Sequence, residues 1–151
     1  MRRVSEMSAG TRVAGCAVLS VLLMASLVWA AQGRTLKVTV NYTGSGEVTA
    51  TNAVYLSVWD TPNMAGGVPI GQQVVTENGA VVSFENLTAS PVYVAALYDD
   101  KGGWDGASVP PSGLPAGAYT TDPTGAPSAI EVGDGQTAEV EFSFSDAFRM
   151  P

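Results

Sequence analysis

Residues 35–42 read TLKVTVNY, so apolar and polar side chains alternate one by one along this stretch. Leu36, Val38 and Val40 fall on one side of the chain, while the threonines and Lys37 fall on the other. Successive side chains of a β-strand point to opposite faces of the sheet. The stretch therefore predicts a strand with one face buried and the other in water.

The same alternation recurs in short segments along the rest of the chain, and no segment has the period of 3.6 that is typical of an amphipathic helix. Further strands are predicted at residues 47–51, 54–60, 70–77, 80–85, 92–99, 129–132 and 137–144. Seven or eight short strands separated by turn residues are typical of a sandwich. We therefore expect an all-β fold, a single antiparallel β-sandwich that occupies residues 31–151.

Two kinds of break separate these strands. Asn78-Gly79 lies between two apolar segments and predicts a β-hairpin, because this dipeptide suits the tight turn of two paired strands. Residues 101–127 are different, since they contain five prolines, many glycines and no sustained alternation. They predict a long loop, and loops of this length in compact domains are usually functional or disordered. This loop is therefore the first place to look for a site.

The first 30 residues have the layout of a secretory signal peptide. Basic residues near the start precede an apolar stretch at 14–28, and Val28-Trp-Ala30 supplies a small-residue cleavage site. We predict cleavage after Ala30, which would place residues 31–151 outside the cell, or in the periplasm or envelope. The alternative is an uncleaved leader that anchors the protein, which is the one membrane contact we expect. Cys16 lies in this leader, so no disulfide is expected in the domain.

Composition excludes several function classes. Residues 31–151 contain four basic and 13 acidic residues, a net charge of about −9, so nucleic acid is not an expected partner. The chain has no histidine, and the domain has no cysteine, which excludes triads and zinc sites that need either residue. Because these catalytic groups are missing from its sequence, we expect that the protein is not an enzyme. The alternative is carbohydrate chemistry that uses Asp99, Asp100 or Asp105 as acid and base.

The same three aspartates are candidate metal ligands. Residues 99–106 read DDKGGWDG and place Asp99, Asp100 and Asp105 among three glycines. Calcium requires six to eight oxygen ligands, which carboxylates and the carbonyls of a flexible loop can supply. However, a standard calcium loop has oxygen ligands at alternating positions, and here Lys101 and Gly103 occupy two of them. The alternative interpretation is an ordinary turn rich in aspartate and glycine.

Aromatic residues form a second candidate site. Segments 54–60 and 92–99 both end in an aromatic residue followed by aspartate, at Trp59 and Tyr98, and Trp104 lies in the long loop. Alternation also places Tyr55 on the same side of its strand as Trp59. Trp59, Tyr98 and Trp104 could together form a platform that binds carbohydrate. The alternative is that these large side chains fill the ends of the core.

Residues 78–87 (NGAVVSFENL) and 91–100 (PVYVAALYDD) resemble the hairpin of transthyretin-like sandwiches, which include the carboxypeptidase regulatory-like and Cna B-type domains. Residues 129–142 resemble the closing pair of strands of that group. One departure is Ser90-Pro91-Val92, where the group usually has Pro-Gly before the second strand. The resemblance implies an accessory, adhesive or ligand-binding module rather than an enzyme. We therefore expect a noncatalytic module for binding or scaffolding at the cell envelope or outside the cell, with protein or carbohydrate as its partner. Residues 99–121 are the expected contact surface.

Two covalent modifications are also compatible with the sequence. Some Cna B-type domains join a lysine of the first strand to an Asn or Asp of the last with the help of a glutamate, and Lys37, Asp146 and Glu85 hold comparable places. Alternation, however, directs Lys37 away from the core. Asn41 and Asn86 each begin an Asn-X-Thr sequon, which accepts a glycan where the host glycosylates exported proteins.

Overall fold

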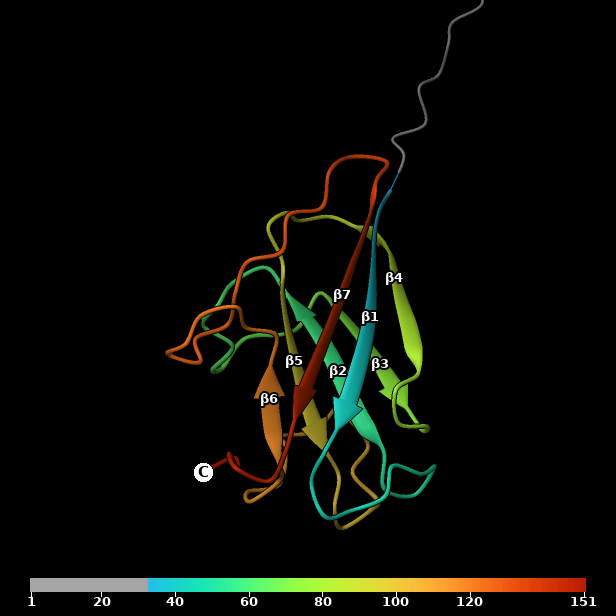
Figure 1. Ribbon diagram of the computed structural model, residues 1–151, viewed down its shortest axis with the longest axis vertical. Coiled ribbons are helices and arrows are strands. Elements are labelled where there is room, and N and C mark those ends of the chain that lie inside the picture. Colours follow the sequence, from blue (N-terminus) through green and yellow to red (C-terminus); the bar gives the residue numbers. More distant parts are fainter. Residues whose placement is uncertain (1–32) are drawn as a thin grey trace, which may run out of the picture.

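The computed structural model describes residues 33–151 as two stacked β-sheets (Figure 1). The predicted leader and its cleavage site lie outside the described residues. The strands are β1 (Arg34–Tyr42), β2 (Val54–Trp59), β3 (Gly71–Val75), β4 (Val81–Leu87), β5 (Tyr93–Tyr98), β6 (Ala116–Ala118) and β7 (Thr137–Phe144). One sheet has the order β4-β1-β7 and the other β3-β2-β5-β6. Residues 33–151 contain no helix that is long and apolar enough to span a membrane.

The all-β prediction is confirmed, but the expectation of a purely antiparallel sandwich is wrong. Strands β1 and β7 pair in parallel and in unbroken register from Thr35–Thr137 to Tyr42–Phe144. The other strand pairs are antiparallel. After β6 the chain returns to the end of the sandwich where β1 begins, so β7 enters the sheet in the same direction as β1 (Figure 1). Alternation of side chains is the same in both directions and therefore could not reveal this.

The Asn78-Gly79 turn is not the predicted hairpin, because β3 and β4 belong to different sheets. The turn instead carries the chain from one sheet to the other. The Asn78 side chain accepts a hydrogen bond from the Tyr42 N–H at 2.7 Å and donates one to the Tyr42 carbonyl at 2.9 Å. Gly79 has a φ of 78° and donates its N–H to the Val40 carbonyl at 3.1 Å. The turn thus continues the pairing of β1 beyond the first residue of β4.

Three predicted elements differ in the structure. Residues 47–51 form a turn rather than a strand, with the Thr49 hydroxyl accepting the N–H of Asn52 at 3.1 Å. Residues 129–132 contribute a single bridge between Ile130 and Val92, so they do not form a closing pair with β7. Conversely, the predicted loop at 101–127 contains β6, which pairs with β5. Its sequence, Ala-Gly-Ala, has no alternation to detect.

The core lies between the two sheets and follows the predicted alternation. Leu36, Val38 and Val40 of β1 are at most 1% exposed, and Val54, Leu56 and Val58 of β2 are equally buried. Where β1 and β5 end, the rings of Tyr42 and Tyr98 stack with their centroids 4.1 Å apart. These two tyrosines close one end of the core and direct their hydroxyl groups into the loops there, the Tyr98 hydroxyl donating to the Glu47 carbonyl at 2.9 Å.

Candidate functional site

The outer face of the three-stranded sheet is polar and charged. Lys37 lies on this face, as its alternation predicted, and its ammonium group contacts Glu139 at 3.2 Å. Asn41 of one sequon donates to Glu141 at 2.9 Å. Because Lys37 points away from the core, it does not meet Asp146, its counterpart in the covalent bond implied by the Cna B-type resemblance. This face has the character of a solvated surface.

The outer face of the four-stranded sheet is uncharged. It consists of the side chains that alternate with the core residues of β2, β3, β5 and β6. None of these side chains is acidic or basic. They are Tyr55, Ser57, Trp59, Gln72, Val74, Tyr93, Ala95, Leu97, Ala116 and Ala118, which we call the uncharged face.

Strand register places the aromatic residues of the uncharged face. Trp59 lies directly opposite Tyr93, and Tyr55 lies between Leu97 and Val74 on the neighbouring strands. Between these two rows runs a row of smaller side chains that includes Ser57. The indole N–H of Trp59 donates to the Ser57 hydroxyl at 2.9 Å, which orients the ring along the sheet.

The loop after β5 packs over one end of the uncharged face. The rings of Tyr55 and Trp104 are 4.5 Å apart at an interplanar angle of 57°, and the Tyr55 hydroxyl donates to the Trp104 carbonyl. The backbone of Gly106 lies against the Tyr55 ring, so that a Cβ atom there would come within 2.7 Å of the ring carbon Cε1. Trp104 thus extends the aromatic surface of β2 into the loop. A shallow hollow of about 410 Å³ lies beside it, lined largely by the loop itself.

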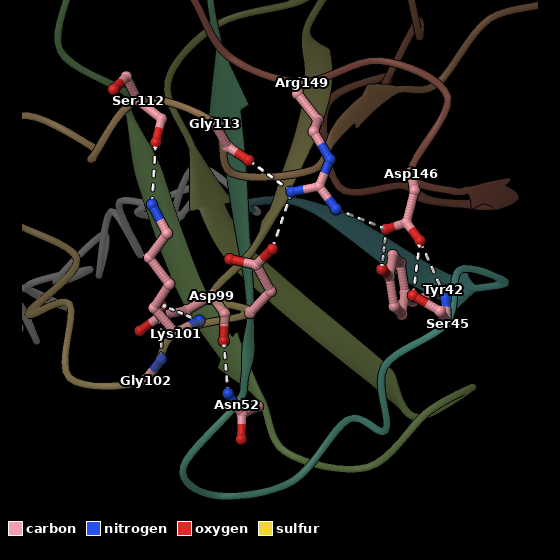
Figure 2. A network of polar contacts seen from close by, with 11 residues as sticks. Tyr42, Ser45, Asn52, Asp99, Lys101, Gly102, Ser112, Gly113, Asp146 and Arg149 are labelled. Carbon is pink, nitrogen blue, oxygen red and sulfur yellow. Dashed lines mark hydrogen bonds and ion pairs between the residues drawn. The ribbon is translucent and has the colours of Figure 1, made fainter.

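Asp99 fixes the shape of this loop. The residue is 2% exposed, and its carboxylate accepts backbone N–H groups from Lys101 at 3.3 Å, Gly102 at 2.9 Å and Trp104 at 2.8 Å. Its own carbonyl accepts the side-chain amide of Asn52 at 3.0 Å (Figure 2). Three donors around one buried carboxylate hold the chain in a tight turn. Asp99 therefore positions Trp104 against Tyr55.

The other two candidate metal ligands have separate partners. Asp100 forms an ion pair with Arg149 at 2.8 Å. Asp105 accepts the N–H groups of Ser108 at 2.8 Å and Ala107 at 3.0 Å, together with the Ser108 hydroxyl at 2.7 Å. The N–H and hydroxyl of Ser108 and the Ala107 N–H lower the pKa of Asp105. Within residues 33–151 no three acidic side chains gather around a common point. The three aspartates are close together in the sequence, but in the structure their carboxylate oxygens contact different partners.

The predicted aromatic platform is brought together only in part. Trp59 and Trp104 lie on the uncharged face and its adjoining loop, respectively. Tyr98 does not join them, because it is 2% exposed and belongs to the core. Tyr98 alternates in register with the buried residues Val94 and Ala96, a signal that the sequence already contained. Tyr55 and Tyr93, rather than Tyr98, are the tyrosines that lie on the uncharged face with Trp59.

A polar network centred on Arg149 lies at the same end of the sandwich (Figure 2). The Arg149 guanidinium donates to Asp100 at 2.8 Å, to the Gly113 carbonyl at 2.6 Å and to Asp146 at 3.4 Å. The hydrogen bond with Asp100 raises the pKa of Arg149. Arg149 thereby joins the loop after β5 to the C-terminal segment. Its partners lie up to 49 residues away in the chain, so no local pattern could reveal the network.

Asp146 connects this network to the end of β1. It accepts the Tyr42 hydroxyl, the Ser45 N–H at 3.0 Å and the Ser45 hydroxyl at 2.9 Å. The Tyr42 hydrogen bond is the largest cause of the lowered pKa of Asp146. Burial of Tyr42, together with this hydrogen bond, raises the pKa of its hydroxyl well above the usual range. Asp146 thus ties the last strand to the first.

Backbone hydrogen bonds complete the attachment of the C-terminal segment. Met150 accepts from the Gly113 N–H at 2.8 Å and donates to the Leu114 carbonyl at 2.9 Å, and Phe148 accepts from the Ala116 N–H at 3.0 Å. The segment therefore lies beside the chain that leads into β6. Asp99 and the C-terminal segment hold the two ends of the loop, which is consequently a fixed part of the surface.

No family model matches this chain, and no curated protein or solved structure matches it. The resemblance to transthyretin-like sandwiches stays a prediction. Its two quoted segments correspond to β4 and β5, which lie in different sheets and do not form a hairpin with each other. The geometry of the surface is therefore the basis on which a function can be argued.

Proposed function

We propose that this protein is a noncatalytic exported module that binds a partner at the cell envelope or outside the cell. Its contact surface is the uncharged face together with the loop at residues 99–121. The observation that carries the proposal is the distribution of charge. The 13 acidic residues of the domain leave one whole sheet face without a charge, while the opposite sheet carries charged side chains in the equivalent positions.

Covering an uncharged face has a smaller desolvation penalty than covering a charged one, because no ion loses its water. The centres of protein contact surfaces are accordingly depleted of charged residues and enriched in tyrosine and tryptophan. Tyr55, Trp59 and Tyr93 give the uncharged face this composition. Trp104 adds an aromatic ring from the loop, which also carries the charged residues Lys101 and Asp105. Val74, which is 51% exposed, adds an apolar side chain at the edge of the sheet.

The rigidity of the surface also favours binding. The aromatic residues of the uncharged face stand on paired strands, and Asp99 holds Trp104 through backbone hydrogen bonds. A surface that is already ordered loses little conformational entropy when a partner binds. Affinity can then come from modest contacts.

The roles of the aspartates support a noncatalytic function. A carboxylate-based carbohydrate enzyme requires two carboxyl groups that face a common substrate. Asp99 is surrounded by backbone donors, Asp100 is paired with Arg149, and Asp105 closes a turn. Each of the three therefore has a structural partner in place of a substrate.

The test compares two exposed valines on edge strands of the two sheets. Val74 of β3 lies on the uncharged face, whereas Val81 of β4 is 62% exposed on the opposite face. The exported protein is incubated with isolated envelopes of its producing organism, and the bound fraction is measured after sedimentation. We expect Val74→Lys to abolish binding and Val81→Lys to leave it unchanged. Equal binding by both variants would refute the proposal, and N-terminal sequencing of the same material tests cleavage after Ala30.

A further inference from the structure

The uncharged face has the chemistry of a surface for a neutral glycan chain. Its hydrogen-bonding side chains are all uncharged: the hydroxyls of Tyr55, Ser57 and Tyr93, the indole N–H of Trp59 and the amide of Gln72. A cationic or anionic partner would be matched by charges of opposite sign, and this face has none to offer. The domain as a whole, at about −9, also repels polyanions. The charge pattern therefore favours an uncharged ligand.

The aromatic rings are spread out rather than gathered around one point. Tyr55 and Trp59 are four residues apart on β2, which separates them by about 13 Å along the strand. Tyr93 lies across from Trp59 on the next strand, and Trp104 lies beyond Tyr55. A small molecule is usually enclosed by a concave pocket. Rings distributed over a sheet instead suit an extended chain that touches several of them in turn.

A glycan offers both kinds of group that this face can contact. The C–H faces of sugar rings are apolar and pack against aromatic rings, while the hydroxyl groups at their edges exchange hydrogen bonds with neutral amides and hydroxyls. Tyrosine and tryptophan combine an apolar body with a polar group in the same way. Between the aromatic rows lies Gln72, whose side-chain amide can reach such hydroxyls. Ser57 on the neighbouring strand instead accepts the Trp59 indole N–H at 2.9 Å and donates to the Ala95 carbonyl at 3.3 Å.

We infer that the uncharged face binds a neutral polysaccharide, with Trp59 and Tyr93 as the main contacts. This inference rests on the proposed binding function and specifies the class of its partner. Trp59 and Tyr93 are the main contacts because they are directly opposite each other and present two aromatic rings side by side. Trp104, held by Asp99, extends the contact at the other end of β2.

The test is affinity electrophoresis of the exported protein in native gels that contain one polysaccharide each. The neutral probes are dextran, glucomannan, arabinoxylan and a β-1,3-glucan, and the anionic probes are alginate and polygalacturonate. We expect at least one neutral probe to retard the protein. Trp59→Ala and Tyr93→Ala should each weaken that retardation about tenfold or more. Val81→Lys is the control on the opposite sheet and should not change it.

A second arm keeps the inference falsifiable if the aromatic variants fold poorly. Val74→Lys changes an exposed side chain at the edge of the same face and should weaken retardation without unfolding the protein. Retardation by the anionic probes alone, or by none of the probes, would overturn the glycan inference. If envelope binding is nevertheless lost in Val74→Lys, the binding function stands and only the ligand class is wrong.

Treatment of the envelopes separates a glycan from a protein partner. Periodate cleaves the vicinal diols of 1,4- and 1,6-linked sugars, and a β-1,3-glucanase cleaves 1,3-linked glucans, which lack internal vicinal diols. A protease removes exposed polypeptide. The inference predicts that periodate or the glucanase abolishes binding and that protease treatment does not. The opposite result would identify a protein partner and overturn the inference. If no treatment abolishes envelope binding, and Val74→Lys and Val81→Lys bind equally well, the proposed function is refuted as well.

Discussion

Replacement of Asp99 by alanine should destabilise the domain and release the loop that carries Trp104. The residue is 2% exposed, and the substitution removes its carboxylate, which accepts three backbone N–H groups. Alanine offers no acceptor, so the donors of Gly102 and Trp104 lose their partner. The turn then has no internal hydrogen bond from this side chain to hold it against Tyr55.

The expected loss of stability follows from the geometry of these bonds. Two of them, at 2.9 and 2.8 Å, are short and go to a charged acceptor, and each such bond contributes roughly 1.5–3 kcal/mol. The third, at 3.3 Å, is weaker. Water can reach part of the loop and satisfy some of the donors, so we expect a net loss of about 3 kcal/mol. For a domain of this size that corresponds to a fall in Tm of about 10 °C.

Asp105 provides a matched control because it also closes a turn through N–H groups but is exposed. Asp105→Ala should therefore lower the free energy of unfolding much less, since water replaces its side chain. Asp99→Asn retains one acceptor oxygen and should be intermediate. Urea denaturation gives the free energies. Quenching of Trp104 fluorescence by acrylamide, in a background with Trp29→Phe and Trp59→Phe, reports whether the loop has been released.

Two results would refute this reasoning. If Asp99→Ala changes the free energy of unfolding by less than about 0.5 kcal/mol, the buried hydrogen bonds do not stabilise the loop. If it destabilises the domain while Trp104 stays equally protected from acrylamide, Asp99 supports the core but does not position Trp104.

Three further predictions concern other parts of the same end of the sandwich. Gly106→Ala should lower Tm more than Gly125→Ala. Both glycines have positive φ, but only a Cβ at position 106 would clash with Tyr55. Equal shifts in Tm would argue against close packing of Gly106 on the Tyr55 ring. The pKa of Asp146 is lower in the folded domain than in the unfolded chain, so its interactions stabilise the fold at pH values above the unfolded pKa. Stability should therefore fall as the pH drops below about 4 and the carboxylate is protonated. Urea titrations at several pH values should show a shallower fall for Asp146→Asn. Asn78→Ala removes both side-chain hydrogen bonds to the Tyr42 backbone and should lower the free energy of unfolding by about 1–2 kcal/mol, whereas unchanged stability would mean that water replaces them fully.

Local pattern was sufficient for most strands and for which side of each strand is buried. Alternation in residues 35–42 correctly placed Leu36, Val38 and Val40 in the core, and it located β7 at the residues where the structure has it. It also placed Trp59 and Tyr55 on the outer face of β2. These features are local because the two-residue period of a strand is a property of its own backbone.

Other features of the site depend on which segments meet. The parallel pairing of β1 with β7, the assignment of β3 and β4 to different sheets, and the network around Arg149 join residues that are far apart in the chain. Asp99, Asp100 and Asp105 looked like one cluster because they are close in sequence, yet their oxygens point to different partners. A short sequence separation sets only a maximum distance between side chains and does not determine their direction.

The sequence by itself thus determined the all-β class, the acidic surface and the alternation that separates core from outer residues. Tertiary structure alone decided that the outer residues of four strands form one uncharged face and that Trp104 lies at its end. The physical reason is that a face belongs to a sheet rather than to a strand. Its composition depends on strand order and register, and these are set by contacts between distant segments.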